Sequence, residues 1–279
     1  MSNYTAADVK RLRELTAAGM MDCKKALEEA DGDFDAAVEI LRVKGAKDVG
    51  KRESRHASNG LVHAIVPANG EGVGALLELN CETDFVAKTP AFQELAAKVT
   101  QIALDANISD VNTLLAHETD GKSVQTLLDE ANVVMGEKVV VGRVAIFNNG
   151  PVFVYLHKSD PALPPTLGVL VELDKNDPEL ARDVAQQIAS MAPIFVTRDE
   201  VSDETLETER RIAETKAHEE GKPEQAVAKI VEGSVVSYYK TNVLVDQAWV
   251  RDNKQTIGQL LASKDTKVQR FARFKVGQA

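Results

Sequence analysis

Two short stretches of the sequence contain residue types that could hold a phosphate group. The first, "DGKS" at 120–123, is similar to the end of a P-loop, but position 116, where that motif needs its first glycine, is Ala116. The second, "GEGVG" at 70–74, lacks the GxGxxG spacing of a dinucleotide site and falls in an expected hairpin turn. Neither stretch predicts a nucleotide site.

Histidine and cysteine are the other residue types that could carry chemistry. The five histidines show neither an HExxH motif nor an i, i+4 pair that would place two of them on one helical face for a metal ion. Cys23 and Cys81 form no CxxC pair, and no neighbouring residues suggest an activated thiolate. We therefore predict no metal site, no cofactor and no covalent catalysis, so the chain is not expected to be an enzyme.

The remaining candidates are residues for recognition. In "LNCETDFVAKTPAF" (79–92), Phe85 and Val86 stand among charged residues just before an expected helix. Phe85 either packs beneath its own loop or enters a crevice of a partner. In "GMMD" (19–22), Met20 and Met21 either fill a gap between helices or form an exposed, adaptable contact.

Composition limits the kind of partner. The chain has 279 residues, of which 44% are hydrophobic, and its formal net charge is −10. This balance predicts a globular protein and disfavours non-specific attraction to nucleic acid or to an anionic membrane. The N-terminus lacks the apolar core of a signal peptide, and no apolar run is long enough to span a bilayer. We expect a soluble, cytoplasmic protein.

The first 45 residues read as three short helices with Thr5 and Asp33 as N-caps. The polar, non-periodic stretch 46–60 is expected to be a linker. Further along, 201–240 reads as an antiparallel helical hairpin turned by "GKP", and the narrow apolar stripe of its return helix predicts a thin coiled coil that projects from the core.

Two related α/β units are expected between these parts. The first, 61–138, starts as a strand hairpin and continues into a helix that Thr89 and Pro90 begin. The second, 139–200 with 241–279, repeats this plan: "GALLELN" (74–80) matches "GVLVELD" (168–174). Thirteen residues (81–93) join strand to helix in the first unit and four (175–178) in the second, so the first connection is nine residues longer than closure requires. Such an excess predicts a binding segment.

At the level of ordered motifs, the chain resembles bacterial translation elongation factor Ts over nearly its full length. The resemblance rests on "LRELTAAGMMDCKKALEEADGDFDAAVEILRVKGA", "CETDFVAK", "GEK" at 136–138, "LGVLVELD" and "EGKPEQAVAKIVEG". It implies an α+β fold with an N-terminal three-helix domain of ubiquitin-associated type, two related α/β core subdomains with antiparallel sheets, and a protruding antiparallel coiled coil.

The resemblance also implies a function for residues 83–86, the TDFV segment. In the family this segment, here Thr83, Asp84, Phe85 and Val86, enters the GTPase domain of elongation factor Tu and disturbs the Mg²⁺ site of bound GDP. Further contacts with the same partner are implied for Met20, Met21, Lys24, Met135, Gly136 and His157.

Three hypotheses follow. The first is a guanine-nucleotide exchange factor for elongation factor Tu, binding its GDP-bound and nucleotide-free forms, without direct nucleic-acid or membrane contact. The second is a scaffold that joins proteins through the ubiquitin-associated-like domain and the coiled coil without catalysing exchange. The third, an enzyme, needs a site that the sequence does not contain. A homodimer or a 2:2 complex with the partner is compatible with the first hypothesis.

Overall fold

Two strands that are buried on both faces form the centres of the fold. The computed structural model describes residues 3–16, 18, 20–41, 43, 55–158 and 160–278. In it, β2 (Gly74–Cys81) and β7 (Leu167–Leu173) are the middle strands of two antiparallel three-stranded sheets, with orders β1-β2-β5 and β6-β7-β10. Near-continuous burial of both middle strands explains why their sequences are almost uniformly apolar.

The first unit combines the sheet β1-β2-β5 with four helices and a small hairpin whose two strands have two residues each. In chain order its elements are β1 (Asn59–Ile65), β2, α4 (Asp84–Ala87), α5 (Pro90–Asp105), α6 (Val111–Ala116), β3 (Glu118–Thr119), β4 (Lys122–Ser123), α7 (Val124–Met135) and β5 (Val140–Phe147).

The second unit follows the same order of strands, with a long helical insertion. Its elements are β6 (Val152–His157), β7, α8 (Pro178–Met191), η1 (Arg198–Glu200), α9 (Asp203–Glu219), α10 (Glu224–Asn242), η2 (Leu244–Asp246), β8 (Ala248–Trp249), β9 (Asp252–Thr256), α11 (Ile257–Ser263) and β10 (Val268–Lys275). The repeat is therefore longer than the two matched motifs: in both units a small hairpin leads into a capped helix and then into the last strand.

One strand lies in a different unit from the one predicted. The sequence places 139–200 in the second unit, but β5 pairs with β2 from Gly74 to Asn80 and completes the first sheet. The short turn before β6 resembles a hairpin connection, yet β5 and β6 belong to different sheets. The boundary thus falls after Phe147. In addition, β1 begins at Asn59, inside the predicted linker, of which 46–54 lies outside the described residues.

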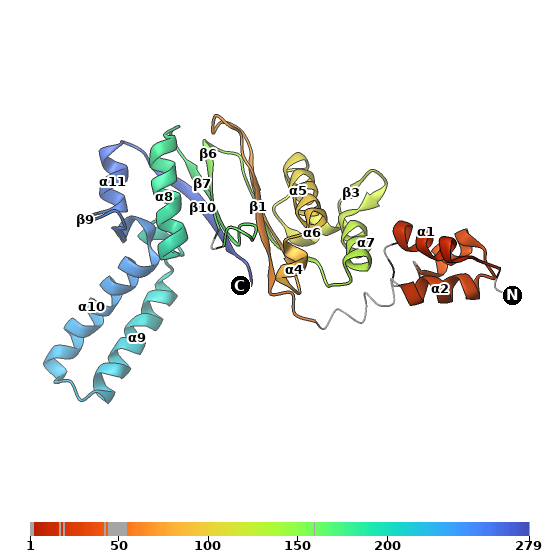
Figure 1. The fold of residues 1–279 in the computed structure, drawn as a ribbon. Coiled ribbons are helices and arrows are strands. Elements are labelled where there is room, and N and C mark those ends of the chain that lie inside the picture. The colour runs from red at the N-terminus through yellow and green to blue at the C-terminus, as the bar shows by residue number, and fades with distance from the viewer. Residues whose placement is uncertain are drawn as a thin grey trace.

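The two sheets pack face to face in the middle of four layers (Figure 1). Helices α5, α6 and α7 cover the outer face of the first sheet, and α8 with α11 covers the second. Between the sheets lies a third apolar cluster, formed by Val62, Leu76, Phe147, Val152, Leu170 and Phe274. Thr89 begins α5 as predicted, and its side chain accepts a hydrogen bond from the first turn of this helix. Asp177, which was not predicted as a cap, does the same for α8, and both helices start with proline.

Each unit buries one glutamate of the repeated motif between the sheets. Glu78 and Glu172 are 2% and 0% exposed, and each accepts a hydrogen bond from an arginine on the neighbouring strand, Arg143 at 2.7 Å and Arg270 at 2.6 Å. The contacts are reciprocal, because Arg143 of the first sheet lies over Phe274 of the second and Arg270 of the second lies over Phe147 of the first. Buried carboxylates are tolerated when they are paired in this way.

The helical insertion of the second unit and the N-terminal part are helical, in the predicted order. α9 and α10 form a hairpin that projects away from the sheets in Figure 1, with Ser202 as N-cap and Gly221 in the left-handed region at the turn. The N-terminal part contains α1 (Ala6–Thr16), α2 (Met20–Glu29) and a helical stretch 34–41, packed around a core of their own. None of the helices in the described part of the chain is long and apolar enough to cross a membrane.

The close approach of the sheets yields a stability prediction. A Cβ atom added to Gly168 would lie 2.5 Å from Cγ1 of Val62, in a contact between the sheets. We expect Gly168→Ala to lower the free energy of unfolding by about 1 to 3 kcal/mol through overpacking, measured as a lower denaturation midpoint. The control is Gly233→Ala in α10, where an added Cβ meets no atom within 4 Å and where alanine should stabilise the helix by up to about 1 kcal/mol. An unchanged midpoint for Gly168→Ala would contradict this description of the interface.

Candidate partner-binding site

The TDFV segment is a capped helical turn rather than an open loop. Thr83 is the N-cap of α4, and its hydroxyl accepts a hydrogen bond from the amide of Val86 at 3.4 Å. The amides of Ala87 and Lys88 donate to the carbonyls of Thr83 and Asp84. The extra residues of the first connection therefore form one turn of helix with a defined direction, which the sequence analysis did not predict.

Phe85 points away from the core on this turn. Its side chain is 77% exposed, whereas Ala87 is buried and Val86 packs against the core of the first unit. This arrangement excludes the packing of Phe85 beneath its own turn, because the residue that packs there is Val86. On the surface, Lys88 lies 3.0 Å from Asp84 and 5.6 Å from the centre of the Phe85 ring. An aromatic ring thus stands next to a carboxylate and an ammonium group.

Two carboxylates hold the TDFV segment against the end of α7. Glu137 accepts two hydrogen bonds from Thr83, one from its amide at 3.0 Å and one from its hydroxyl at 2.6 Å. In the opposite direction, Glu82 accepts a hydrogen bond from the amide of Lys138 at 2.7 Å. The "GEK" motif contains Glu137, but the role of this residue could not be predicted from the sequence, since its partner is 54 positions away.

Among the predicted contact residues, Met135 and Gly136 are brought close to the TDFV segment. Gly136 ends α7 in the left-handed conformation, with φ +74°, and immediately precedes Glu137. Met135 is partly buried against the same core as Val86. The end of α7 and the TDFV segment therefore form one continuous surface of the first unit.

The other predicted contacts lie on different elements. His157 is at the exposed end of β6 in the second sheet, where Tyr155 is its hydrogen-bond partner at 3.0 Å. Met20, Met21 and Lys24 lie at the start of α2, with both methionines exposed, which favours the contact reading over gap filling. No residue of the N-terminal cluster contributes to the described apolar clusters of the two sheets.

Cys81 lies directly beneath the TDFV segment. Its thiol is buried and donates to the carbonyl of Thr83 at 3.1 Å. Burial, followed by the charge of Glu137, raises the pKa of Cys81 to about 12, so the group is a neutral thiol at physiological pH. Within the described ranges, no three side chains of His, Cys, Asp or Glu gather closely enough to hold a metal ion.

Comparison with known proteins identifies the family. The family model described as "Elongation factor TS" matches residues 82–278, a range that begins at the residue before the TDFV segment. The chain belongs to the elongation factor Ts family. Similar members include the elongation factors Ts of Thermobifida fusca (56% identity over 280 residues, 100% of both chains), Acidothermus cellulolyticus (55% over 278 residues, 100% of both) and Streptomyces ramocissimus (51% over 278 residues, 99% of this chain and 100% of the relative). The family is one of translation elongation factors, as the resemblance in sequence predicted.

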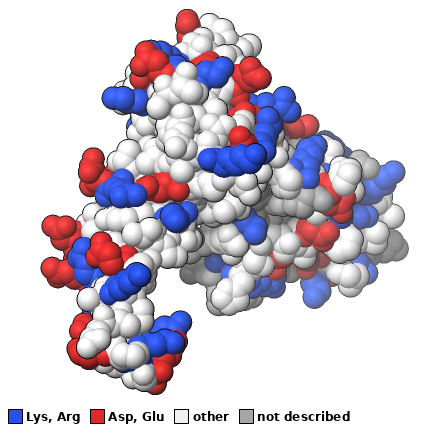
Figure 2. Space-filling view, turned by 90° about the vertical axis from the view of Figure 1, so that its left-hand side faces the viewer, with Lys and Arg blue, Asp and Glu red and all other residues white. Residues whose placement is uncertain are grey.

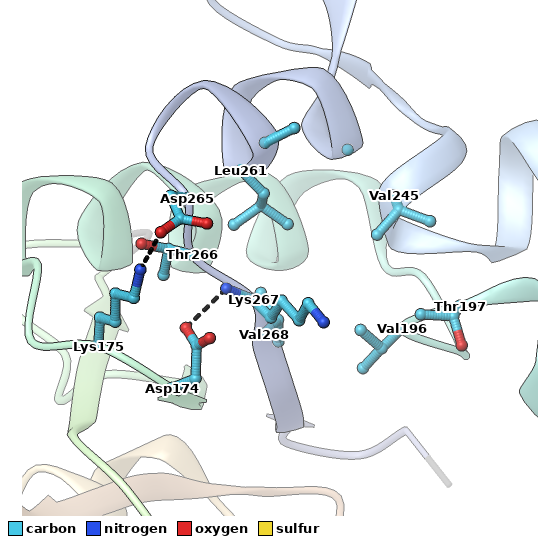
Figure 3. Close-up of a pocket in the computed structure, with 12 residues that line it drawn as sticks. Asp174, Lys175, Val196, Thr197, Val245, Leu261, Asp265, Thr266, Lys267 and Val268 are labelled. Atoms are coloured by element: carbon cyan, nitrogen blue, oxygen red, sulfur yellow. Dashed lines mark hydrogen bonds and ion pairs between the residues drawn. The ribbon is translucent and has the colours of Figure 1, made fainter.

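In this member of the elongation factor Ts family, a groove of about 720 Å³ lies in the second unit, near the end of β7 (Figure 3). Val196 and Val245 face Leu261 and Val268 across it, and Asp174, Lys175 and Asp265 stand at one side. Lys175 contacts Asp265 at 2.5 Å, and this hydrogen bond holds the pKa of the aspartate below its ordinary value. No residue implied by the elongation factor Ts resemblance lines this groove.

Charge on the face of the second unit and the helical hairpin is mixed. Figure 2 shows Lys and Arg interspersed with Asp and Glu over this face, around uncharged areas on the body. No field of a single sign covers it. The face seen in Figure 2 therefore has no broad cationic surface of the kind that binds a phosphate backbone.

The state of Cys81 can be tested by alkylation. In a Cys23→Ala background, Cys81 should react with iodoacetamide at pH 8 far more slowly than a free cysteine, because raising the pKa from 9.0 to about 12 lowers the thiolate fraction about a thousandfold and burial adds to the effect. In denaturant it should react at the ordinary rate. Rapid alkylation of the folded protein would contradict the buried position of this thiol.

Proposed function

We propose that this chain is a guanine-nucleotide exchange factor for elongation factor Tu, and that the TDFV segment is the wedge that releases Mg²⁺ and GDP. The observation that carries the proposal is the exposed Phe85 on a turn that is capped internally and anchored to a second loop. Contact of an exposed phenylalanine side chain with water is unfavourable, and this contact is removed when a partner covers the side chain. A rigid mount means that little conformational entropy is lost when the partner does so.

The mechanism needs no covalent step. A GTPase holds GDP partly through Mg²⁺, which bridges phosphate oxygens and a P-loop hydroxyl. Insertion of Phe85 and Asp84 near that metal would move the elements that position it and so weaken the whole nucleotide contact. Asp84 and Phe85 are consecutive residues of one helical turn, and Lys88 contacts both of them.

The magnitude is adequate for part of the effect. Burying one phenylalanine contributes about 1.5 to 3 kcal/mol, and each 1.4 kcal/mol corresponds to about a tenfold change in affinity. The wedge alone would therefore lower the affinity of the partner for GDP by about ten- to a hundredfold. Met135 and Gly136, next to the TDFV segment, are proposed to add contacts that prefer the nucleotide-free partner, and so are His157, Met20, Met21 and Lys24. The cycle is driven forward when GTP binds and the factor leaves.

Three further assignments belong to the same proposal. The N-terminal helices 1–45 would form a domain of ubiquitin-associated type, and α9 and α10 would form a coiled coil. The protein would act in the cytoplasm, as a homodimer or in a 2:2 complex with its partner. The packed N-terminal cluster and the antiparallel pairing of α9 with α10 support the first two assignments.

A GDP-release assay tests the wedge. We expect the double variant Asp84→Ala, Phe85→Ala to slow the release of labelled GDP from purified elongation factor Tu by about ten- to a hundredfold relative to the parent, because the wedge is removed. Since Phe85 is exposed, the thermal midpoint should not fall. The matched control is Ile212→Ala, which removes a 53% exposed apolar side chain of α9 and should leave release unchanged.

The same assay separates the alternatives. If the folded double variant released GDP at the parental rate, the wedge mechanism would be wrong. A parent that bound the partner stably without changing GDP release would instead favour the scaffold hypothesis, and turnover of nucleotide by the isolated chain would indicate an enzyme.

A further inference from the structure

The carboxylate of Glu137, just after α7, joins this end of the helix to the TDFV segment. The Glu137 carboxylate places one oxygen 3.0 Å from the amide nitrogen and the other 2.6 Å from the hydroxyl of Thr83. Within the described part of the chain, no Lys, Arg or His lies at ion-pair distance from it. A part-buried carboxylate is thus committed to a single threonine instead of to a cation.

The second unit shows which part of this junction the fold needs. There, Asp174 accepts from the amide of Lys267 at 2.7 Å, just as Glu82 accepts from Lys138 in the first unit. The amide of Asp174 also donates to the carbonyl of Lys267 at 3.1 Å. A further side-chain link is the ion pair of Lys175 with the 97% exposed carboxylate of Asp265. Exposed pairs of this kind contribute little to stability. Only the first unit, which contains the TDFV segment, directs a carboxylate to the backbone and the cap of an added turn.

We propose that Glu137 is a positioning residue for nucleotide exchange, and that it sets the direction of Phe85 through Thr83. The inference rests on the proposed function. The path is short and continuous: Glu137 fixes the amide and hydroxyl of Thr83, the Thr83 hydroxyl caps the amide of Val86, and the capped turn holds Phe85 outward.

The direction of each hydrogen bond supports this path. A threonine hydroxyl has one proton, and its donation to Glu137 leaves the oxygen lone pairs available for the Val86 amide. Donation to a charged acceptor also makes the hydroxyl oxygen a stronger acceptor in turn. Without Glu137, the Thr83 hydroxyl is free to rotate, and a four-residue helix has little other stabilisation.

The test is a double-mutant cycle on exchange. The variants are Glu137→Ala, Thr83→Val and their combination; Thr83→Val removes the hydroxyl and keeps the branched shape. We expect Glu137→Ala to lower the maximal GDP-release rate of the saturated partner by about tenfold, as the loss of charge-assisted hydrogen bonds predicts. The half-saturating concentration should change by less than about twofold, because the remaining contacts are intact.

Two controls separate positioning from general stability. Glu130→Ala in α7 removes an exposed ion pair with Lys122 of β4 and should leave exchange unchanged. The combined variant should be no slower than the slower single variant, because both substitutions break one path. Thr83→Ser, which keeps the hydroxyl, should restore most of the rate lost in Thr83→Val.

A second readout needs no partner. The amides of Val86, Ala87 and Lys88 donate hydrogen bonds within the turn. Their hydrogen exchange should be about tenfold faster in Glu137→Ala than in the parent, with the rest of the first unit unchanged. Parental exchange of these amides would overturn the inference, as would a parental GDP-release rate or independent, multiplying effects of the two substitutions. If the parent chain itself failed to release GDP while these amides still responded to Glu137, the proposed function would fail and the positioning of the turn would stand.

Discussion

The contact between the two sheets is the constraint on which the rest of the structure depends. Gly74 and Gly168, the first residues of the repeated motif, leave no room for a side chain, because an added Cβ would lie 2.4 Å from Val152 and 2.5 Å from Val62. The glutamates of the same motif are buried in this layer and paired with arginines that stack on the opposite sheet. A buried carboxylate without its partner is costly, so these pairs specify how the sheets are placed as much as they stabilise them.

This constraint extends to the surface through β2. The strand is held by β1 and β5 along its edges, by α5 on one face and by the second sheet on the other. It ends at the buried Cys81, whose thiol meets the carbonyl of Thr83. The TDFV segment therefore starts from a fixed point, and Glu137 and Glu82 hold its other side. The exposed Phe85 and the half-buried Asp84 therefore stand on a turn that is held by hydrogen bonds at both of its sides.

Much of the fold could be predicted from local patterns, because strands with apolar periodicity, proline at the first turn of α5 and α8, and the repeated G-x-L-x-E-L motif each act over a few residues. The partner of β5 could not, since a strand's sheet is decided by contacts far away in sequence, and the short 148–151 turn favours the wrong pairing. At the site, the nine-residue excess marked the segment that carries the exposed Phe85. Its helical turn and its link to Glu137 were missed because a four-residue helix has no periodicity and the link spans 54 positions.

The central claim is that the chain and GDP oppose each other on one GTPase, and a thermodynamic cycle tests it most directly. Binding of the full chain to elongation factor Tu should be measured with the partner nucleotide-free and with the partner saturated with GDP, alongside the affinity of GDP with and without the chain. By linkage, GDP must lower the affinity of the partner for the chain by the same factor by which the chain lowers the affinity of the partner for GDP. The account predicts a factor well above ten. Equal affinity of the chain for both forms of the partner would contradict it.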